Sequence, residues 1–60
     1  MNGYLVWYTD GTTKHFDEAE EVMKNLNNAE TITDELYADG KYIGEVDLTV
    51  EEFLEMLDYS

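Results

Sequence analysis

The chain has 60 residues and carries fifteen Asp and Glu against three Lys and one His, which gives a formal net charge of −12. Hydrophobic residues make up 43% and aromatic residues 13%, a composition too apolar for a disordered acidic tail. So strong a negative field repels nucleic-acid backbones and anionic membranes, and it favours basic protein surfaces as partners. Because cysteine is absent, disulfides and thiolate metal sites are excluded.

The length predicts a single domain, residues 1–60, with a thin core and no room for a deep active-site cleft. The first residues do not show the basic segment and apolar run of a signal peptide, and no apolar stretch approaches the ~18 residues of a membrane span. We therefore expect a protein of the cytoplasm, in a bacterial host cell.

The first third of the chain predicts a hairpin followed by a helix. Residues 4–9 are aromatic and β-branched and lead into Asp10-Gly11, a strong signal for a two-residue hairpin turn, so that residues 12–16 form the second strand. Asp17, followed three residues later by Glu20, predicts an N-terminal cap, and the apolar spacing behind it predicts a helix over residues 18–26. The helix is predicted to end in Asn27-Asn28, because asparagine tolerates the left-handed conformation that closes many helices.

A two-residue first turn also assigns the faces of the sheet. It places Trp7 and Phe16 on one face and Val6 and His15 on the other. Trp7 is predicted to anchor the core, since so small a domain needs its largest apolar side chain inside. Two short helices can cover only one face, so aromatic side chains are expected to be partly exposed on the other face, namely Tyr4, Tyr8, Tyr37 and Tyr42.

The second half repeats the pattern. Residues 31–38 and 41–46 read as strands around the turn Asp39-Gly40, and Thr49 with Glu52 forms a capping box at the start of a second helix. That helix has an apolar stripe of Val50, Phe53, Leu54 and Leu57. The chain thus predicts an α+β fold of ββα-ββα order, with a single small antiparallel sheet and two helices packed on one face.

The acidic residues gather in the first turn of each helix, around the second hairpin and along the last helix. Glu51, Glu55 and Asp58 lie four and three residues apart, so like charges lie side by side on one helical face. A two-residue second turn would set Asp34 opposite Glu45, another like-charge pair. The predicted partner-binding residues are these acids, their acidic neighbours and two tyrosines: Asp34, Glu35, Asp39, Glu45, Asp47, Glu51, Glu52, Glu55, Asp58, Tyr37 and Tyr42.

Enzymatic and metal-binding patterns are weak. His15 is the only histidine and has no nucleophile at a recognisable catalytic spacing, while the pair Asp34 and Glu35 lacks the walled site that acid–base chemistry requires. The segment around Gly40 resembles a calcium-binding EF-hand loop, but its register puts Tyr37 and Val46 at ligand positions. We expect no enzyme activity, no catalytic residue, no metal site and no cofactor.

A very short, strongly acidic, cysteine-free α+β chain resembles the phage-encoded inhibitors of bacterial defence and repair: DNA-mimic anti-restriction proteins, uracil-DNA glycosylase inhibitors and anti-CRISPR proteins. The resemblance lies in size and charge, covers the whole chain and carries over no functional residue. It implies stoichiometric inhibition of a basic nucleic-acid-binding protein, such as a Cas effector or a restriction or repair enzyme, by a DNA mimic that blocks its groove.

The residues leave other interpretations open. The protein could instead be a small interaction module or a homodimer that uses an exposed sheet face or edge strand. The acids would then serve solubility, or adaptation to high salt, without mimicry.

Overall fold

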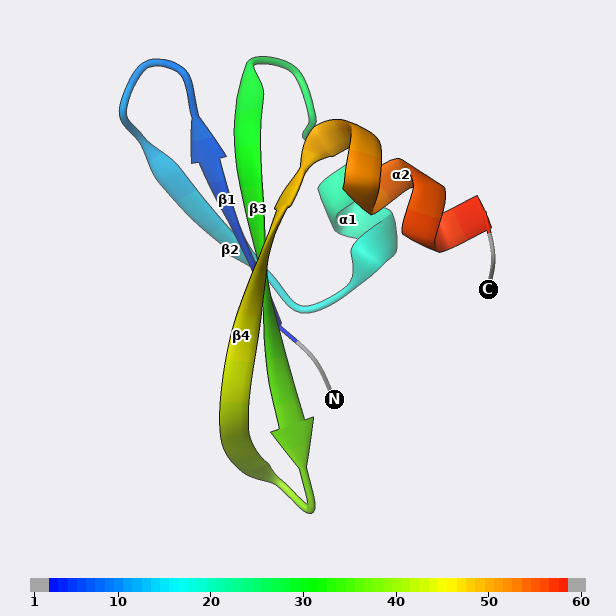
Figure 1. Ribbon diagram of the computed structural model, residues 1–60. Coiled ribbons are helices and arrows are strands. Elements are labelled where there is room, and N and C mark those ends of the chain that lie inside the picture. The colour runs from blue at the N-terminus through cyan, green and yellow to red at the C-terminus, as the bar shows by residue number, and fades with distance from the viewer. Residues whose placement is uncertain (1–2, 59–60) are drawn as a thin grey trace.

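The computed structural model describes residues 3–58. In this part of the chain the elements follow in the order β1 (Gly3–Tyr8), β2 (Thr13–Phe16), α1 (Ala19–Met23), β3 (Ala29–Ala38), β4 (Lys41–Thr49) and α2 (Val50–Asp58). The strands form one antiparallel sheet in the order β2-β1-β3-β4 (Figure 1). The predicted α+β class with a small antiparallel sheet is confirmed.

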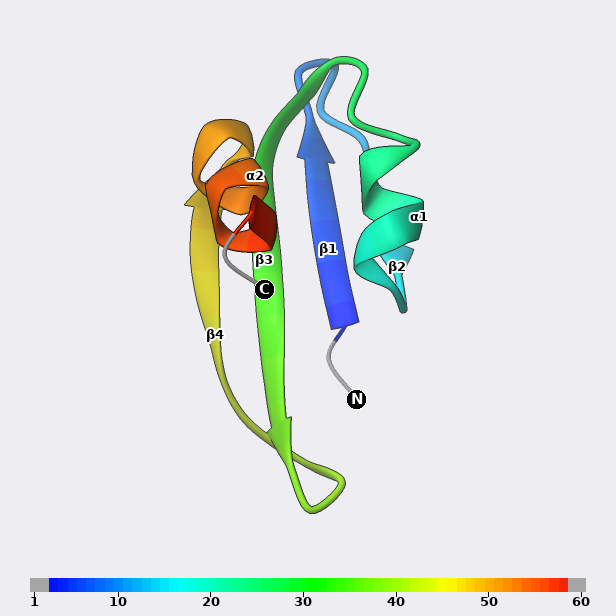
Figure 2. The ribbon, with the colours of Figure 1, turned by 90° about the vertical axis from the view of Figure 1, so that its right-hand side faces the viewer.

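Both helices cover the same face of the sheet, with α1 in front of β1 and β2, and α2 in front of β3 and β4 (Figure 2). The core lies between these layers. Val6 of β1 and Ile32 of β3 are register partners and are fully buried, together with Val22 of α1 and Phe53 of α2. Because each helix contributes one of these four side chains, the two halves share one core. We call the covered side the helix face and the other side the open face.

The first hairpin differs from the prediction by one residue. The amide of Tyr8 donates to the carbonyl of Thr12, and the amide of Gly11 donates to the carbonyl of Tyr8, so residues 9–11 form a three-residue loop. Gly11 has a φ of 90°, the left-handed conformation that ends such a loop. The extra loop residue pairs Tyr4 with Phe16, which puts Phe16 on the helix face with Tyr4 and Val6.

This shift corrects the predicted faces. Trp7 lies on the open face and is 46% exposed, so the prediction that it anchors the core is wrong. Tyr4 and Tyr8 lie on the helix face, half-buried against the core, and not on the open face where they were predicted. The ring of Tyr4 makes an edge-to-face contact with Phe53, with centroids 5.8 Å apart. The prediction of exposed tyrosines holds for Tyr37 and Tyr42, which are 38% and 49% exposed.

The second hairpin has the predicted two-residue turn. Ala38 pairs with Lys41, and both Asp39 and Gly40 have positive φ, as such a turn requires. The register then shifts, since Tyr37 pairs with Tyr42 while Leu36 pairs with Gly44. The extra residue in β4 is a β-bulge, and it moves every later pairing by one position.

The two helices differ in how well their start was predicted. At α2 the capping box is confirmed: the amide of Thr49 donates to Glu52 Oε1 over 2.9 Å, and the amide of Glu52 donates to Thr49 Oγ1 over 3.0 Å. The first helix is shorter than predicted, and its cap residue is Glu18, without a side-chain hydrogen bond. The predicted cap of Asp17 with Glu20 is therefore wrong.

Candidate protein-binding surface

No helix of residues 3–58 covers the open face, and β3 runs along its middle. The strand presents Thr31, Thr33, Glu35 and Tyr37 there, at alternate positions. On β4, the side chains of Tyr42, Glu45 and Asp47 lie on the same side, as their contacts with these β3 residues show. Five of the eleven predicted binding residues are thus brought together, and we call them the open-face cluster: Glu35, Tyr37, Tyr42, Glu45 and Asp47.

Two tyrosines form the aromatic end of this cluster. The rings of Tyr37 and Tyr42 meet edge to face, with centroids 5.9 Å apart and planes at 88°. The hydroxyl of Tyr42 donates to Glu45 Oε1 over 2.9 Å. This hydrogen bond is the main reason that the pKa of Tyr42 is raised, and the negative charges of Glu45 and Glu35 act in the same direction.

The bulge in β4 changes which acids face each other. Glu35 lies directly opposite Glu45, whereas Asp34 pairs with Val46, so the predicted pair of Asp34 and Glu45 is wrong. A like-charge pair is nevertheless present on the ladder. Like charges directly opposite each other destabilise a sheet.

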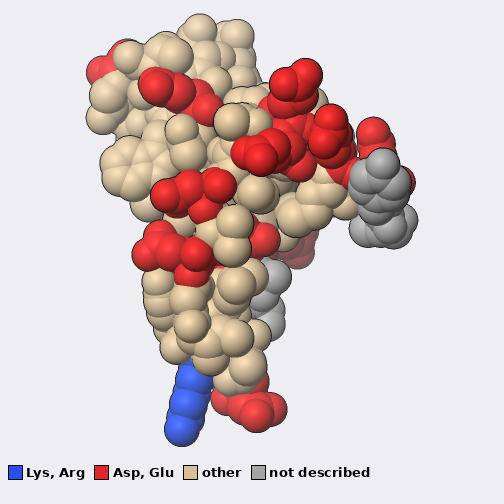
Figure 3. Space-filling view, in the orientation of Figure 1, with Lys and Arg blue, Asp and Glu red and all other residues tan. Residues whose placement is uncertain are grey.

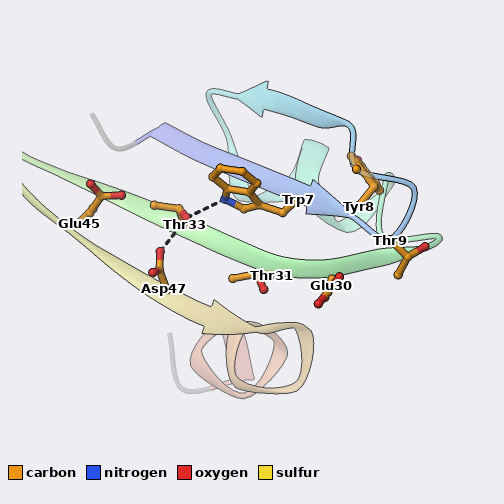
Figure 4. Close-up of a pocket in the computed structure, with 9 residues that line it drawn as sticks. Trp7, Tyr8, Thr9, Glu30, Thr31, Thr33, Glu45 and Asp47 are labelled. Atoms are coloured by element: carbon orange, nitrogen blue, oxygen red, sulfur yellow. Dashed lines mark hydrogen bonds between the residues drawn. The ribbon is translucent and has the colours of Figure 1, made fainter.

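Trp7 is connected to the cluster by a chain of hydrogen bonds (Figure 4). Its indole Nε1–H donates to Thr33 Oγ1 over 3.0 Å, and the Thr33 hydroxyl donates to Asp47 Oδ1 over 2.8 Å. Thr33 is buried, and it links β1 through β3 to β4. The indole and the carboxylate of Asp47 are therefore held in fixed positions across the open face.

At the other end of β1, Gly3 has no side chain, and this leaves room for His15 and Glu35 to meet over its backbone. Nε2 of His15 and Oε1 of Glu35 lie 2.8 Å apart, where a ring N–H can donate to the carboxylate. A Cβ atom on Gly3 would come within 2.8 Å of both atoms. His15 also lies 3.9 Å from Asp17. Its role here is to bring β2 and β3 together across β1.

Asp34 is not part of any exposed surface, which corrects its prediction as a binding residue. It is 7% exposed and lies on the helix face opposite Tyr4. Its Oδ1 atom has no hydrogen-bond partner within residues 3–58. Burial raises the pKa of this carboxyl group, and the pKa of Tyr4 is raised by burial and then by the charge of Asp34.

The remaining predicted acids lie outside the open face. Glu51, Glu52, Glu55 and Asp58 are exposed on α2, and Asp39 is at the tip of the β3–β4 hairpin. In the view of Figure 1, β4 crosses in front of the sheet with α2 beside it, and Figure 3 shows from the same side that acidic side chains gather over these two elements. The acids of α2 and of the open face thus border the same β4 edge.

Few of these charges are compensated. Within residues 3–58, His15 makes the contacts between a basic side chain and a carboxylate, and no lysine has a carboxylate within 4 Å. The last turn of α2 contains no basic residue. No lysine in this part of the chain therefore offsets the carboxylates of α2 and β4.

The described residues contain no group of three or more His, Asp or Glu that could hold a metal ion. No helix formed by residues 3–58 has the length and apolar character to cross a membrane. A scan against protein-family models, a search of curated proteins and a search of solved structures found no match for this chain.

Sequence reasoning missed two residues of this surface, Trp7 and Thr33. The signal that could have placed Trp7 was the first turn, because Asp-Gly also fits the last two positions of a three-residue loop. Thr33 carried no signal of its own, since a threonine in a strand is common and its hydrogen bonds depend on the register of three strands.

Proposed function

We propose that the protein is a stoichiometric inhibitor that occupies the positively charged groove of a nucleic-acid-binding protein. The class of target would be a bacterial defence or repair protein, such as a Cas effector or a restriction enzyme, and the inhibitor would be encoded by a phage or mobile element and act in the host cytoplasm without catalysis. The observation that supports this proposal best is the uncompensated acidic surface on α2 and β4, where no lysine lies within 4 Å of a carboxylate in residues 3–58.

The placement of the acids costs stability, which argues against simple solubility. Glu51 and Glu55, and then Glu55 and Asp58, are like-charge neighbours on α2, and each such pair costs about 0.2–0.5 kcal/mol. Asp58 is also at the unfavourable end of the helix dipole. Solubility needs net charge but does not need like charges side by side, so this arrangement supports a role in binding.

The spacing of the carboxylates suits a surface that normally binds phosphates. On α2, residues four apart are separated by about 6 Å along the axis, and on β4, residues two apart by about 7 Å. Successive phosphates of one DNA strand advance by about 3.4 Å along the duplex axis while winding around it, so their separation through space is comparable. A basic groove could exchange its counterions for these carboxylates much as it does for nucleic acid.

Apolar contacts would hold the complex once the charges have brought the partners together. Tyr37 and Tyr42 are exposed beside Glu35 and Glu45. Charge on the rim of an interface chiefly increases the association rate, whereas buried aromatic contacts slow dissociation. Affinity for the target should therefore fall as the salt concentration rises.

A second function is favoured by a separate observation. β4 is an edge strand of nine residues, and two of its own apolar side chains are exposed, Ile43 at 64% and Val46 at 46%. Such an edge can pair with a strand of another molecule, so the protein could instead be an interaction module or a homodimer.

Competition distinguishes the two functions. A basic protein captured from a bacterial lysate on the immobilised chain is tested for nucleic-acid binding with and without the inhibitor. Mimicry requires that inhibitor and nucleic acid exclude each other; a captured protein that binds its nucleic acid normally in the complex contradicts it and supports the interaction module. A dimer measured by light scattering at micromolar concentration would support the homodimer.

Charge variants test which acids are responsible. The triple variant Glu51→Gln, Glu55→Gln and Asp58→Asn removes three charges from α2 and should weaken inhibition at least tenfold. The matched control Glu18→Gln, Glu20→Gln and Glu21→Gln removes three exposed charges at α1. Equal effects of the two variants would mean that only net charge matters, and the proposed surface would be wrong.

A further inference from the structure

The open face contains a shallow groove with a volume of about 640 Å³ beside Trp7 (Figure 4). Its middle is formed by two threonines of β3, Thr31 and Thr33. Trp7 of β1 lies on one side, and Glu45 and Asp47 of β4 lie on the other, with Glu30 farther along β3. An aromatic ring and carboxylates thus border one hollow, separated by the short side chains of the central strand.

The two sides are held in position before any ligand binds. The indole N–H and Asp47 Oδ1 are both hydrogen-bonded to the Thr33 hydroxyl, and Glu45 Oε1 accepts the hydroxyl of Tyr42. No other hydrogen bond of Asp47 is seen within the described residues, so its second oxygen remains available to a donor in the groove. A preorganised site loses less conformational entropy when it binds.

We propose that this groove receives the guanidinium group of an arginine on the partner protein. The inference rests on the proposed function in one respect, that the partner surface is basic. A guanidinium is planar, so it can stack on the exposed indole and donate N–H groups toward the carboxylates on β4 at the same time. Because Nε1 of the indole lies 3.0 Å from Thr33 Oγ1, and Thr33 Oγ1 lies 2.8 Å from Asp47 Oδ1, a flat group that rests on the face of the indole is within reach of the carboxylate.

Arginine fits this groove better than the other cations. A lysine ammonium is a compact, strongly hydrated charge that can meet the carboxylates or the ring but does not stack. A divalent metal ion would need several oxygen ligands, and the described residues contain no such group. The exposed tryptophan is the feature that a purely anionic surface would not need, since leaving a large aromatic side chain in water forfeits its burial energy.

The chain contains a single tryptophan, so its indole N–H gives one signal in a ¹H–¹⁵N NMR spectrum. The protein is titrated at constant ionic strength with the peptide acetyl-Ala-Arg-Ala-amide, and in parallel with the same peptide carrying lysine or citrulline. We expect the arginine peptide to shift the indole signal in a saturable way, with an affinity about threefold or more above that of the lysine peptide. Citrulline, which has the same shape without the charge, should give no saturable shift.

Asp47→Asn is the informative variant, because an asparagine oxygen can still accept from Thr33 while the charge is lost. It should weaken the arginine peptide about threefold or more, whereas Glu20→Gln, which also removes one negative charge but on α1, should leave affinity within a factor of two. Equal shifts by the arginine and lysine peptides, an equal shift by Mg²⁺, or equal effects of the two variants would overturn the proposal. The proposed function is tested separately by the triple variant of α2. If the arginine peptide does not bind, while that triple variant still abolishes competition with nucleic acid, only the proposed arginine groove is refuted.

Discussion

The buried carboxyl group of Asp34 gives the sharpest test of the structure. The side chain is 7% exposed, its Oδ1 atom has no hydrogen-bond partner within residues 3–58, and it faces the ring of Tyr4 on the helix face. An unsatisfied buried polar group costs roughly 1–3 kcal/mol, and a charged one costs more. Asp34→Asn removes the charge but keeps a carbonyl oxygen in the same position, so only part of this cost is relieved.

We therefore expect Asp34→Asn to raise the free energy of unfolding at pH 7 by about 1 kcal/mol, which corresponds to roughly 4–8 °C in Tm for a domain of this size. The matched control is Glu30→Gln, which removes one exposed charge from the same strand and should change stability by no more than about 0.5 kcal/mol. Urea unfolding followed by circular dichroism measures both variants.

The pH dependence of the stability tests whether the buried charge of Asp34 causes this difference. Because burial raises the pKa of Asp34, the folded protein binds this proton at a higher pH than the unfolded chain does. The wild-type protein therefore gains stability from Asp34 as the pH falls from neutrality through the raised pKa, and the gain is complete below the ordinary carboxyl pKa of about 3.9. The advantage of Asp34→Asn should shrink over the same range. A variant that is no more stable at pH 7, or whose advantage is constant down to pH 4, would refute the reasoning.

Two further substitutions test local features. Thr49→Ala removes the hydroxyl that accepts the Glu52 amide and should destabilise the protein by about 1 kcal/mol in urea unfolding; a loss no larger than that of an exposed strand threonine such as Thr13→Ala would contradict the capping role. Gly3→Ala places a Cβ within 2.8 Å of His15 Nε2 and Glu35 Oε1, so it should separate these two groups. Its ¹⁵N NMR spectrum should show changed His15 ring signals, and unchanged signals would mean that the two side chains do not meet in solution.

The features predicted correctly from the sequence are those determined by a few adjacent residues. The turn at Asp39-Gly40 needs two positive φ angles, which this dipeptide supplies, and the start of α2 follows from the reciprocal hydrogen bonds of Thr49 and Glu52. The first helix lacked such a local constraint. Its acids can lie before or inside a helix, and the structure ends α1 at Met23.

The errors come from register, which a single residue can change. Asp10-Gly11 fits a two-residue loop or the end of a three-residue loop, and the choice decides whether Phe16 shares a face with Trp7 or with Val6. The bulge in β4 exchanges Asp34 for Glu35 as the partner of Glu45. Strand order and side-chain contacts across three strands, such as the link from Trp7 to Asp47, arise only when these registers are combined.

These one-residue shifts change the binding surface in opposite ways. They remove Asp34 from it, and they add Trp7, which is exposed and oriented by hydrogen bonds. They also place Glu35 directly opposite Glu45, so a like-charge pair remains on the open face. A surface that keeps repelling acids while exposing its single tryptophan next to them sacrifices both electrostatic and hydrophobic stability in the free protein. A basic partner that contributes an arginine would relieve both costs at once, which is why charge and aromatic exposure point to the same kind of partner.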